Sequence, residues 1–216
     1  MGNTDYELVV FDMDGVLVDV ESSWCWVHEH FNVNNDHSLE AYLNGEIDDL
    51  EFIRRDIALW KDKKSDITKD DIEKILKSAP IMPGYKDCLT SFKDHGFNTA
   101  IISGGLKPLA RMIGDGYFDA IKANDVDSEE NELTGEGILE VPLNDKGSSF
   151  DELISSFGIS PEKTIAVGNS FIDVPMLERA GLGIAFDPAD EKVRYAADVI
   201  ITEKDLSKVW EAVGKF

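Results

Sequence analysis

Short apolar runs recur along the chain, and most are followed by a segment whose apolar positions have helical spacing. The runs are ELVVF (7–11), NTAIIS (98–103), KTIAVG (163–168), LGIAF (182–186) and DVIIT (198–202). Apolar runs of this length are typical of buried strands. Strands that alternate with helices predict an α/β fold, in which helices cover both faces of a parallel sheet.

The helical patterns between these runs are several times closed by glycine, the residue that commonly ends a helix. They are YKDCLTSFKDHG (85–96), LKPLARMIGDG (106–116), SSFDELISSFG (148–158), DVPMLERAG (173–181) and DEKVRYAA (190–197). A further segment, DVDSEENELTGEGI (125–138), predicts a short β-hairpin or a loop excursion.

One long segment departs from the alternation, because no strand pattern occurs from about Val20 to Pro80. Four helical patterns fill it: SSWCWVHEHF (22–31), SLEAYLNG (38–45), DDLEFIRRDIALWK (48–61) and TKDDIEKILKSA (68–79). Thr68 has the side chain and position of a helix N-cap. The segment PIMPG (80–84) marks the return to the alternating pattern, so we expect a helical insert after the first strand.

Composition narrows the class of protein. A length of 216 residues suits one domain that carries a smaller insert, and the formal net charge of -22 argues against binding to nucleic acid or to an anionic membrane. No apolar stretch approaches the length of a membrane helix, and the first residues lack the layout of a signal peptide. With two widely spaced cysteines, expected to be reduced, the chain is predicted to be soluble and cytoplasmic.

Polar residues whose side chains could take part in catalysis or binding follow the predicted strands. Asp12 and Asp14 end the first apolar run, Ser103-Gly104-Gly105 ends the second, and Asn169 and Asp173 follow the third, while Lys146 precedes the helical pattern that leads to the third run. In parallel α/β sheets, ligands bind beyond the carboxyl ends of the strands. We therefore expect these side chains to converge at one edge of the sheet.

This set of groups suits phosphoryl transfer. Oxygen ligands select Mg²⁺, which keeps several waters and a substrate phosphate. One carboxylate can attack phosphorus, and a second can give a proton to the leaving oxygen and then take one from water. A lysine, a hydroxyl and glycine amides can hold the phosphoryl oxygens.

Each residue taken alone also has a structural interpretation. The two aspartates can belong to a turn, the Ser-Gly-Gly segment to a loop and Lys146 to the surface. Asp173 can cap the helix that follows it, where Pro175 fits the first turn. Their order and common location favour a functional site.

The same residues resemble the haloacid dehalogenase-like superfamily of aspartate-nucleophile phosphatases. FDMDGVLVD (11–19) is similar to its first motif, ISGG (102–105) to its second, DKG (145–147) to its lysine motif and GNSFIDVPML (168–177) to its fourth. Within the superfamily the chain most resembles the phosphoserine phosphatase branch. The helical insert, the doubled glycine and the segment ELTGEGILEVPLNDKGSSFDEL (132–153) carry this resemblance.

The resemblance implies a Rossmann-like core of residues 1–18 and 83–216, with a helical cap of residues 19–82. It implies Mg²⁺-dependent hydrolysis of a small phosphorylated metabolite, most closely phosphoserine. Asp12 would attack phosphorus, and Asp14 would move the protons. The remaining implied positions are Ser103, Gly104 and Lys146 for phosphate, and Glu21 and Arg54 for the substrate's amino and carboxylate groups. The metal would be held by Asp12, the Asp14 main-chain carbonyl and Asn169, with Asp173 as a further ligand or as an anchor behind the ligands.

The chain departs from the family pattern at a few positions, and these keep alternatives open. Asn169 and Ile172 stand where the fourth motif usually has Asp and Asn, Val16 stands where Thr is usual, and Arg55 competes with Arg54. The alternatives are another substrate such as a sugar phosphate or phosphoglycolate, phosphoryl transfer to another acceptor, and a weakened member that binds without turnover. The sequence is compatible with a monomer or a homodimer.

Overall fold

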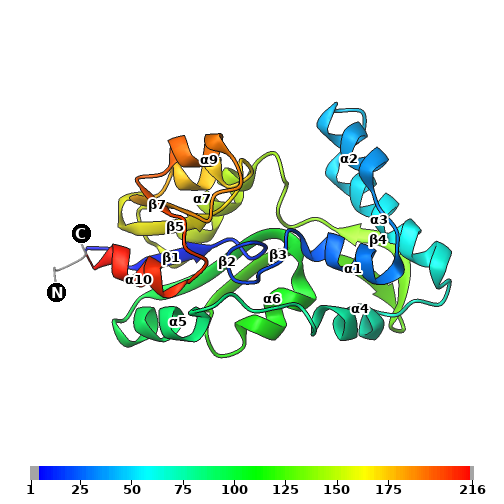
Figure 1. Ribbon diagram of the computed structural model, residues 1–216, viewed down its shortest axis with the longest axis horizontal. Coiled ribbons are helices and arrows are strands. Elements are labelled where there is room, and N and C mark those ends of the chain that lie inside the picture. Colours follow the sequence, from blue (N-terminus) through cyan, green and yellow to red (C-terminus); the bar gives the residue numbers. More distant parts are fainter. Residues whose placement is uncertain (1–4, 215–216) are drawn as a thin grey trace.

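The computed structural model describes residues 5–214, in which seven strands form one sheet in the order β4-β3-β2-β1-β5-β6-β7 (Figure 1). The strands are β1 (Leu8–Phe11), β2 (Asn98–Leu106), β3 (Ala120–Glu129), β4 (Glu132–Ile138), β5 (Thr164–Gly168), β6 (Leu182–Phe186) and β7 (Val199–Ile201). The ladders from β3 to β7 are parallel, and β4 pairs antiparallel with β3. The predicted α/β fold is confirmed.

Helices cover both faces of the sheet, and β1 shows why. Its side chains alternate, so that Val9 and Phe11 enter one buried cluster while Leu8 and Val10 enter another. The first cluster includes residues of α5 (Tyr85–Asp94), α6 (Lys107–Gly114) and α10 (Ser207–Val213); the second includes residues of α7 (Lys146–Phe157), α8 (Val174–Leu177) and α9 (Glu191–Ala196). A short 3₁₀ turn, η1 (Pro161–Lys163), precedes β5.

The predicted insert after the first strand is also confirmed. Four helices separate β1 from β2: α1 (Ser23–Phe31), α2 (Asp36–Leu43), α3 (Asp49–Lys63) and α4 (Lys69–Leu76). They lie together beyond one end of the sheet, beside β4 (Figure 1). Within residues 5–214, none of the helices is long and apolar enough to span a bilayer.

The chain leaves the core and re-enters it along two adjacent segments. The Asp19 amide donates to the Pro80 carbonyl at 2.8 Å, and the Met82 amide donates to the Leu17 carbonyl at 3.0 Å. These hydrogen bonds lie beside the domain boundaries that we expect between residues 18 and 19 and between residues 82 and 83. The boundaries themselves stay a prediction.

The start of α4 matches its sequence signal. The Thr68 side chain accepts from the Asp71 amide, and the Asp71 carboxylate accepts from the Thr68 amide, which completes a capping box. The prediction of Thr68 as the N-cap is confirmed.

The segment before residue 125 was not expected to be a strand. Residues Ala120–Asn124 form the first half of β3 and pair in parallel with β2, whereas the expected hairpin is only the far half of β3 with β4. The sequence AIKANDVDSE has too many polar residues to show a buried strand. The hairpin supports the insert, because the Lys69 amide donates to the Asn131 carbonyl at 2.8 Å and the Leu133 amide to the Ile67 carbonyl at 3.0 Å.

Candidate active site

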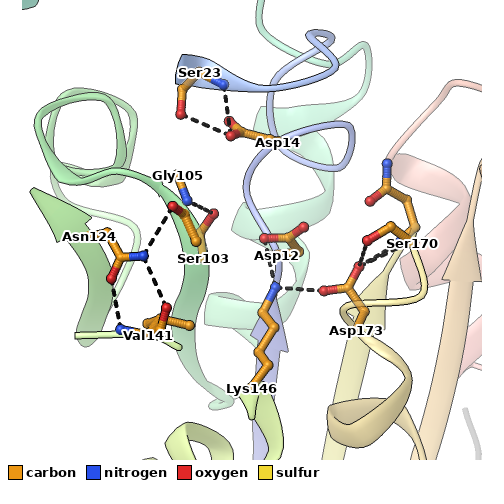
Figure 2. Close-up of polar contacts among 12 residues, drawn as sticks. Asp12, Asp14, Ser23, Ser103, Gly105, Asn124, Val141, Lys146, Ser170 and Asp173 are labelled. Atoms are coloured by element: carbon orange, nitrogen blue, oxygen red, sulfur yellow. Dashed lines mark hydrogen bonds and ion pairs between the residues drawn. The ribbon is translucent and has the colours of Figure 1, made fainter. Parts of the chain in front are cut away.

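The carboxyl ends of β1, β2 and β5 meet at one edge of the sheet, where several of the predicted site residues lie. Asp12 follows β1, Ser103 lies near the end of β2, and Asp173 belongs to the loop after β5. Figure 2 shows Lys146 entering this group from below. The helical pattern that we began at residue 148 starts in fact at Lys146, which is the first residue of α7.

A buried lysine joins two buried carboxylates. The Lys146 ammonium lies 2.8 Å from Asp12 Oδ1 and 2.6 Å from Asp173 Oδ1, and its side chain is 1% exposed (Figure 2). Burial opposes the charge of Lys146, but the two carboxylates outweigh it and raise the lysine pKa. The interpretation of Lys146 as a surface residue is wrong.

Asp12 keeps an elevated pKa despite this partner. Burial and the nearby charge of Asp173 raise the pKa of Asp12 to about 6, and Lys146 opposes the increase. A carboxylate in this state is ionised at neutral pH and is weakly solvated, which favours a role as nucleophile.

Asp173 fixes the loop after β5. Its Oδ2 accepts from the Asn169 amide at 2.8 Å and from the Ser170 amide at 3.0 Å, while Oδ1 pairs with Lys146. Its side chain makes no capping hydrogen bond to α8, so the alternative of a simple helix cap is wrong.

Ser23, a residue of the insert, holds the Asp14 carboxylate in place. Asp14 Oδ2 accepts from both the amide and the hydroxyl of Ser23, each at 2.8 Å, and Asp14 Oδ1 is buried without a hydrogen-bond partner (Figure 2). Burial raises the pKa of Asp14 to about 7 against the effect of the Ser23 hydrogen bonds. At neutral pH such a carboxyl group populates both the acid and the base form.

The loop at the end of β2 is held on two sides. The Gly104 carbonyl accepts from Trp24 Nε1 at 3.1 Å and from Asn124 Nδ2 at 3.3 Å, while Ser103 Oγ accepts from the Gly105 amide at 3.1 Å. Asn124 also donates to the Val141 carbonyl and accepts from the Val141 amide. Sequence patterns do not predict that Trp24 and Asn124 contact this loop, because each residue is far from Gly104 in the sequence.

Two glycines permit the close approach of the site loops. A Cβ atom at Gly105 would lie 2.5 Å from Asp14 Oδ2, and a Cβ atom at Gly15, where φ is +75°, would lie 2.0 Å from Asn169 Nδ2. Asn169 therefore lies directly beside the loop that carries Asp14.

The donors around this point fit Mg²⁺. Within residues 5–214, no three acidic, histidine or cysteine side chains gather as a complete protein cage. Mg²⁺ does not need one, since it accepts a few oxygen ligands together with water and phosphate. Asp12, the Asp14 main-chain carbonyl and Asn169 could supply such oxygens. Both oxygens of Asp173 already have partners, which favours its role as an anchor of the site over that of a ligand.

The two predicted substrate-selecting residues have different surroundings. Glu21 is exposed on the insert. Arg54 pairs with Glu136 at 2.6 Å and approaches Glu51 at 3.7 Å, while Arg55 pairs with Glu51 at 2.9 Å. Among the described residues, the ion pairs of both arginines are with these surface glutamates and not with the Asp12–Lys146 group.

A cleft of about 530 Å³ lies between the insert and the core. Its core side includes Leu143, Asn144 and Ile172, which are close in sequence to Lys146 and Asp173. A Cβ atom at Gly104 would lie 2.3 Å from Leu143 Cδ2, so the cleft adjoins the loop at the end of β2. Its lining contains none of the predicted site residues, and no lysine or arginine.

The chain is similar in sequence and in fold to known hydrolases. The family model described as a haloacid dehalogenase-like hydrolase matches residues 6–181. The chain is 30% identical to a phosphoserine phosphatase of Wolinella succinogenes over 94% of this chain and 98% of that protein, and 29% identical to one of Idiomarina loihiensis over 94% and 91%. A solved substrate-bound phosphoserine phosphatase complex is similar with a TM-score of 0.80 and 25% identity, covering 96% of this chain and 98% of that one.

Proposed function

The chain belongs to the haloacid dehalogenase-like hydrolases and is a phosphomonoester hydrolase; from this premise we propose that it hydrolyses phosphoserine, with Asp12 as nucleophile and Mg²⁺ as cofactor. The observation that carries the proposal is the buried line of Asp12, Lys146 and Asp173 with Asp14 beside it. Three buried charges and an unpartnered carboxylate oxygen at one sheet edge are costly unless a ligand completes them.

In the first step, a carboxylate oxygen of Asp12 attacks phosphorus, and the bond from phosphorus to the substrate oxygen breaks. The leaving oxygen takes the proton of Asp14. The product of this step is an alcohol and an aspartyl-phosphate at residue 12. Lys146, Ser103 and the Gly104 amide hold the phosphoryl oxygens as their charge redistributes.

In the second step, Asp14, now ionised, takes a proton from a water molecule that attacks the aspartyl-phosphate. Phosphate leaves, Asp12 is regenerated and Asp14 is again protonated. Mg²⁺, held by Asp12, the Asp14 carbonyl and Asn169, would supply positive charge to the phosphoryl oxygens. Asp173 keeps Lys146 and the Asn169 loop in place.

The proposal also covers the role of the insert as a cap and the cellular location of the protein. Residues 19–82 act as a cap over the core, and its closure would exclude water from the aspartyl-phosphate until the alcohol has left. The free thiols of Cys25 and Cys88 favour a reducing, cytoplasmic location.

Phosphoserine is the first candidate because the relatives named above are phosphoserine phosphatases. Under this proposal Glu21 binds the ammonium group, and Arg54 exchanges Glu136 for the substrate carboxylate. Release of phosphate from a panel of phosphomonoesters, with and without Mg²⁺, tests the reaction. Glu21→Ala and Arg54→Ala should each lower kcat/KM for phosphoserine, and unchanged turnover in both variants would reject this substrate assignment.

A second candidate substrate is a phosphomonoester whose organic part carries no carboxylate, such as a sugar phosphate. The pairing of Arg54 with Glu136 favours it, because this arginine already has a carboxylate partner within the protein. In the same panel, higher kcat/KM for a sugar phosphate than for phosphoserine would select this candidate and leave the roles of Asp12 and Asp14 intact.

A further inference from the structure

The side chain of Ser23 is buried between Asp14 and the loop at the end of β2. Ser23 is the first residue of α1 and has no exposed surface. Its amide and its hydroxyl both donate to Asp14 Oδ2 at 2.8 Å, and its Oγ accepts from the Leu106 amide, also at 2.8 Å (Figure 2). One serine therefore connects the insert, the predicted proton-transfer carboxylate and the phosphate loop.

The Leu106 amide determines where the Ser23 proton points. A hydroxyl has one proton, and its oxygen here already accepts from the Leu106 amide. The proton is then available for Asp14 Oδ2, which receives a second bond from the Ser23 amide. Two donors from one residue fix the rotation of the carboxylate group.

The same arrangement leaves the other carboxylate oxygen free. Asp14 Oδ1 is buried and has no hydrogen-bond partner. Close packing restricts movement on the Ser23 side, because a Cβ atom at Gly105 would lie 2.5 Å from Asp14 Oδ2 and 2.6 Å from Ser23 Oγ. Oδ1 is thus the oxygen of Asp14 that no protein group occupies, and it is the one left to exchange a proton with a ligand that reaches it.

We propose that Ser23 is the positioning residue of Asp14, and that it holds Oδ2 so that Oδ1 faces the oxygen atoms that gain and lose protons. The inference rests on the proposed role of Asp14 in phosphomonoester hydrolysis. It also makes the first turn of α1 part of the reaction site, although α1 belongs to the insert and not to the core.

Two substrates whose leaving groups differ in basicity can distinguish misplacement of Asp14 from a general loss of activity. The alcohol of phosphoserine is a strongly basic leaving group and needs a proton as it departs, whereas the p-nitrophenolate of p-nitrophenyl phosphate does not. The value of kcat/KM reports the steps up to formation of the aspartyl-phosphate, in which Asp14 acts as the acid.

The experiment measures kcat/KM in Mg²⁺ for phosphoserine, or for the alkyl phosphate that the wild type prefers, and for p-nitrophenyl phosphate. We expect Ser23→Ala to lose about 10- to 100-fold with the alkyl phosphate and less than about threefold with p-nitrophenyl phosphate. Asp14→Asn should show the same contrast with a larger loss, of about 100-fold or more for the alkyl phosphate.

Ser22→Ala is the matched control. Ser22 is the N-cap of α1, and its Oγ accepts from the Trp24 amide at 3.2 Å, so the variant loses a hydroxyl of the same helix turn without touching Asp14. Its ratio of the two kcat/KM values should equal that of the wild type. Because each ratio is internal to one variant, a reduced folded fraction does not affect it.

Equal losses on both substrates in Ser23→Ala, with a clear contrast in Asp14→Asn, would overturn the role of Ser23 and leave the proposed function in place. Equal losses on both substrates in Asp14→Asn would overturn the acid role of Asp14, and the inference with it. A ratio in Ser22→Ala as low as that in Ser23→Ala would assign the effect to the helix start and would also overturn the inference.

Discussion

At the scale of single residues, the site is built from groups that are poorly solvated before any substrate arrives. Asp12, Lys146 and Asp173 are buried together, and one oxygen of Asp14 lacks a partner. Breaking such a set by removing one member leaves an uncompensated buried charge, whereas neutralising a group that lacks an opposite partner removes a cost. The residues of the site therefore differ in how their substitution changes stability.

Asp14→Asn should stabilise the metal-free protein at high pH. Burial raises the pKa of Asp14 to about 7, above the value of about 3.9 for an unfolded aspartate. The folded protein thus binds this proton more tightly, and the associated stability is complete below about pH 4 and is lost as the pH rises through 7. The variant should gain about 1–3 kcal/mol at pH 8, a rise in Tm of roughly 3–9 °C, and little at pH 4.

Thermal unfolding in a chelator at the two pH values measures this difference. A gain in Tm that is the same at pH 4 and pH 8 would show that ionisation of Asp14 is not its source. A loss of stability at pH 8 would contradict the raised pKa.

Asn169→Asp should tighten the metal site. Asn169 lies beside Gly15 and offers a neutral oxygen, and a carboxylate there would add a negative charge next to the expected Mg²⁺. We expect the Mg²⁺ concentration for half-maximal phosphate release to fall about tenfold. An unchanged or higher requirement would place the metal away from residue 169.

The sequence allowed the prediction that residues directly following the apolar runs lie close together at one edge of the sheet. Asp12 and Asp14 stand out because two carboxylates end a buried strand. Lys146 stands out only because it lies just before the helical pattern that leads to the third apolar run. The sequence did not reveal the contacts of Ser23, Asn124 or the Arg54–Glu136 pair, because each joins segments that only the tertiary fold brings together.

At the scale of elements, the β3–β4 hairpin links the core sheet to the insert. Its strand β4 packs against α3, and main-chain hydrogen bonds join its turn to the start of α4. A hairpin is one of the two forms that the sequence predicts for this segment, but the extension of β3 into the main sheet is not predicted, because polar side chains interrupt β3. Binary patterning detects strands with one or two apolar faces and misses those whose polar groups find buried partners, as Asn124 does.

Gly137→Ala should test this link. A Cβ atom at Gly137 would lie 2.2 Å from Ile53 Cγ2 and 3.0 Å from Ile53 Cβ, and a β-branched side chain cannot easily turn away. We expect a loss of about 1–3 kcal/mol in the free energy of unfolding. In the double variant with Ile53→Ala, the loss should be smaller than the sum of the two single losses.

Urea denaturation of the wild type, the two single variants and the double variant gives the four free energies of unfolding that this double-mutant cycle compares. Strictly additive losses would mean that β4 and α3 are not packed at this point.

At the scale of the whole molecule, the candidate active site joins two parts of the chain that the sequence separates. The core supplies Asp12, Lys146 and Asp173, and the insert supplies Ser23 and Trp24 beside the loop at the end of β2. The alternation of strands and helices was sufficient to predict the core and the insert. The way the first turn of α1 packs on the core depends on distances across the fold, which periodicity does not contain.

The location of the phosphoryl group during turnover tests the proposed role of Asp12 as the nucleophile. The protein is mixed with phosphoserine and Mg²⁺, quenched in acid and reduced with borohydride, which converts an aspartyl-phosphate to homoserine, and its peptides are analysed by mass spectrometry. We expect homoserine at position 12, dependent on substrate and Mg²⁺ and absent in Asp12→Asn. Steady release of phosphate by the wild type without modification of Asp12, or with modification at another residue, would contradict this role.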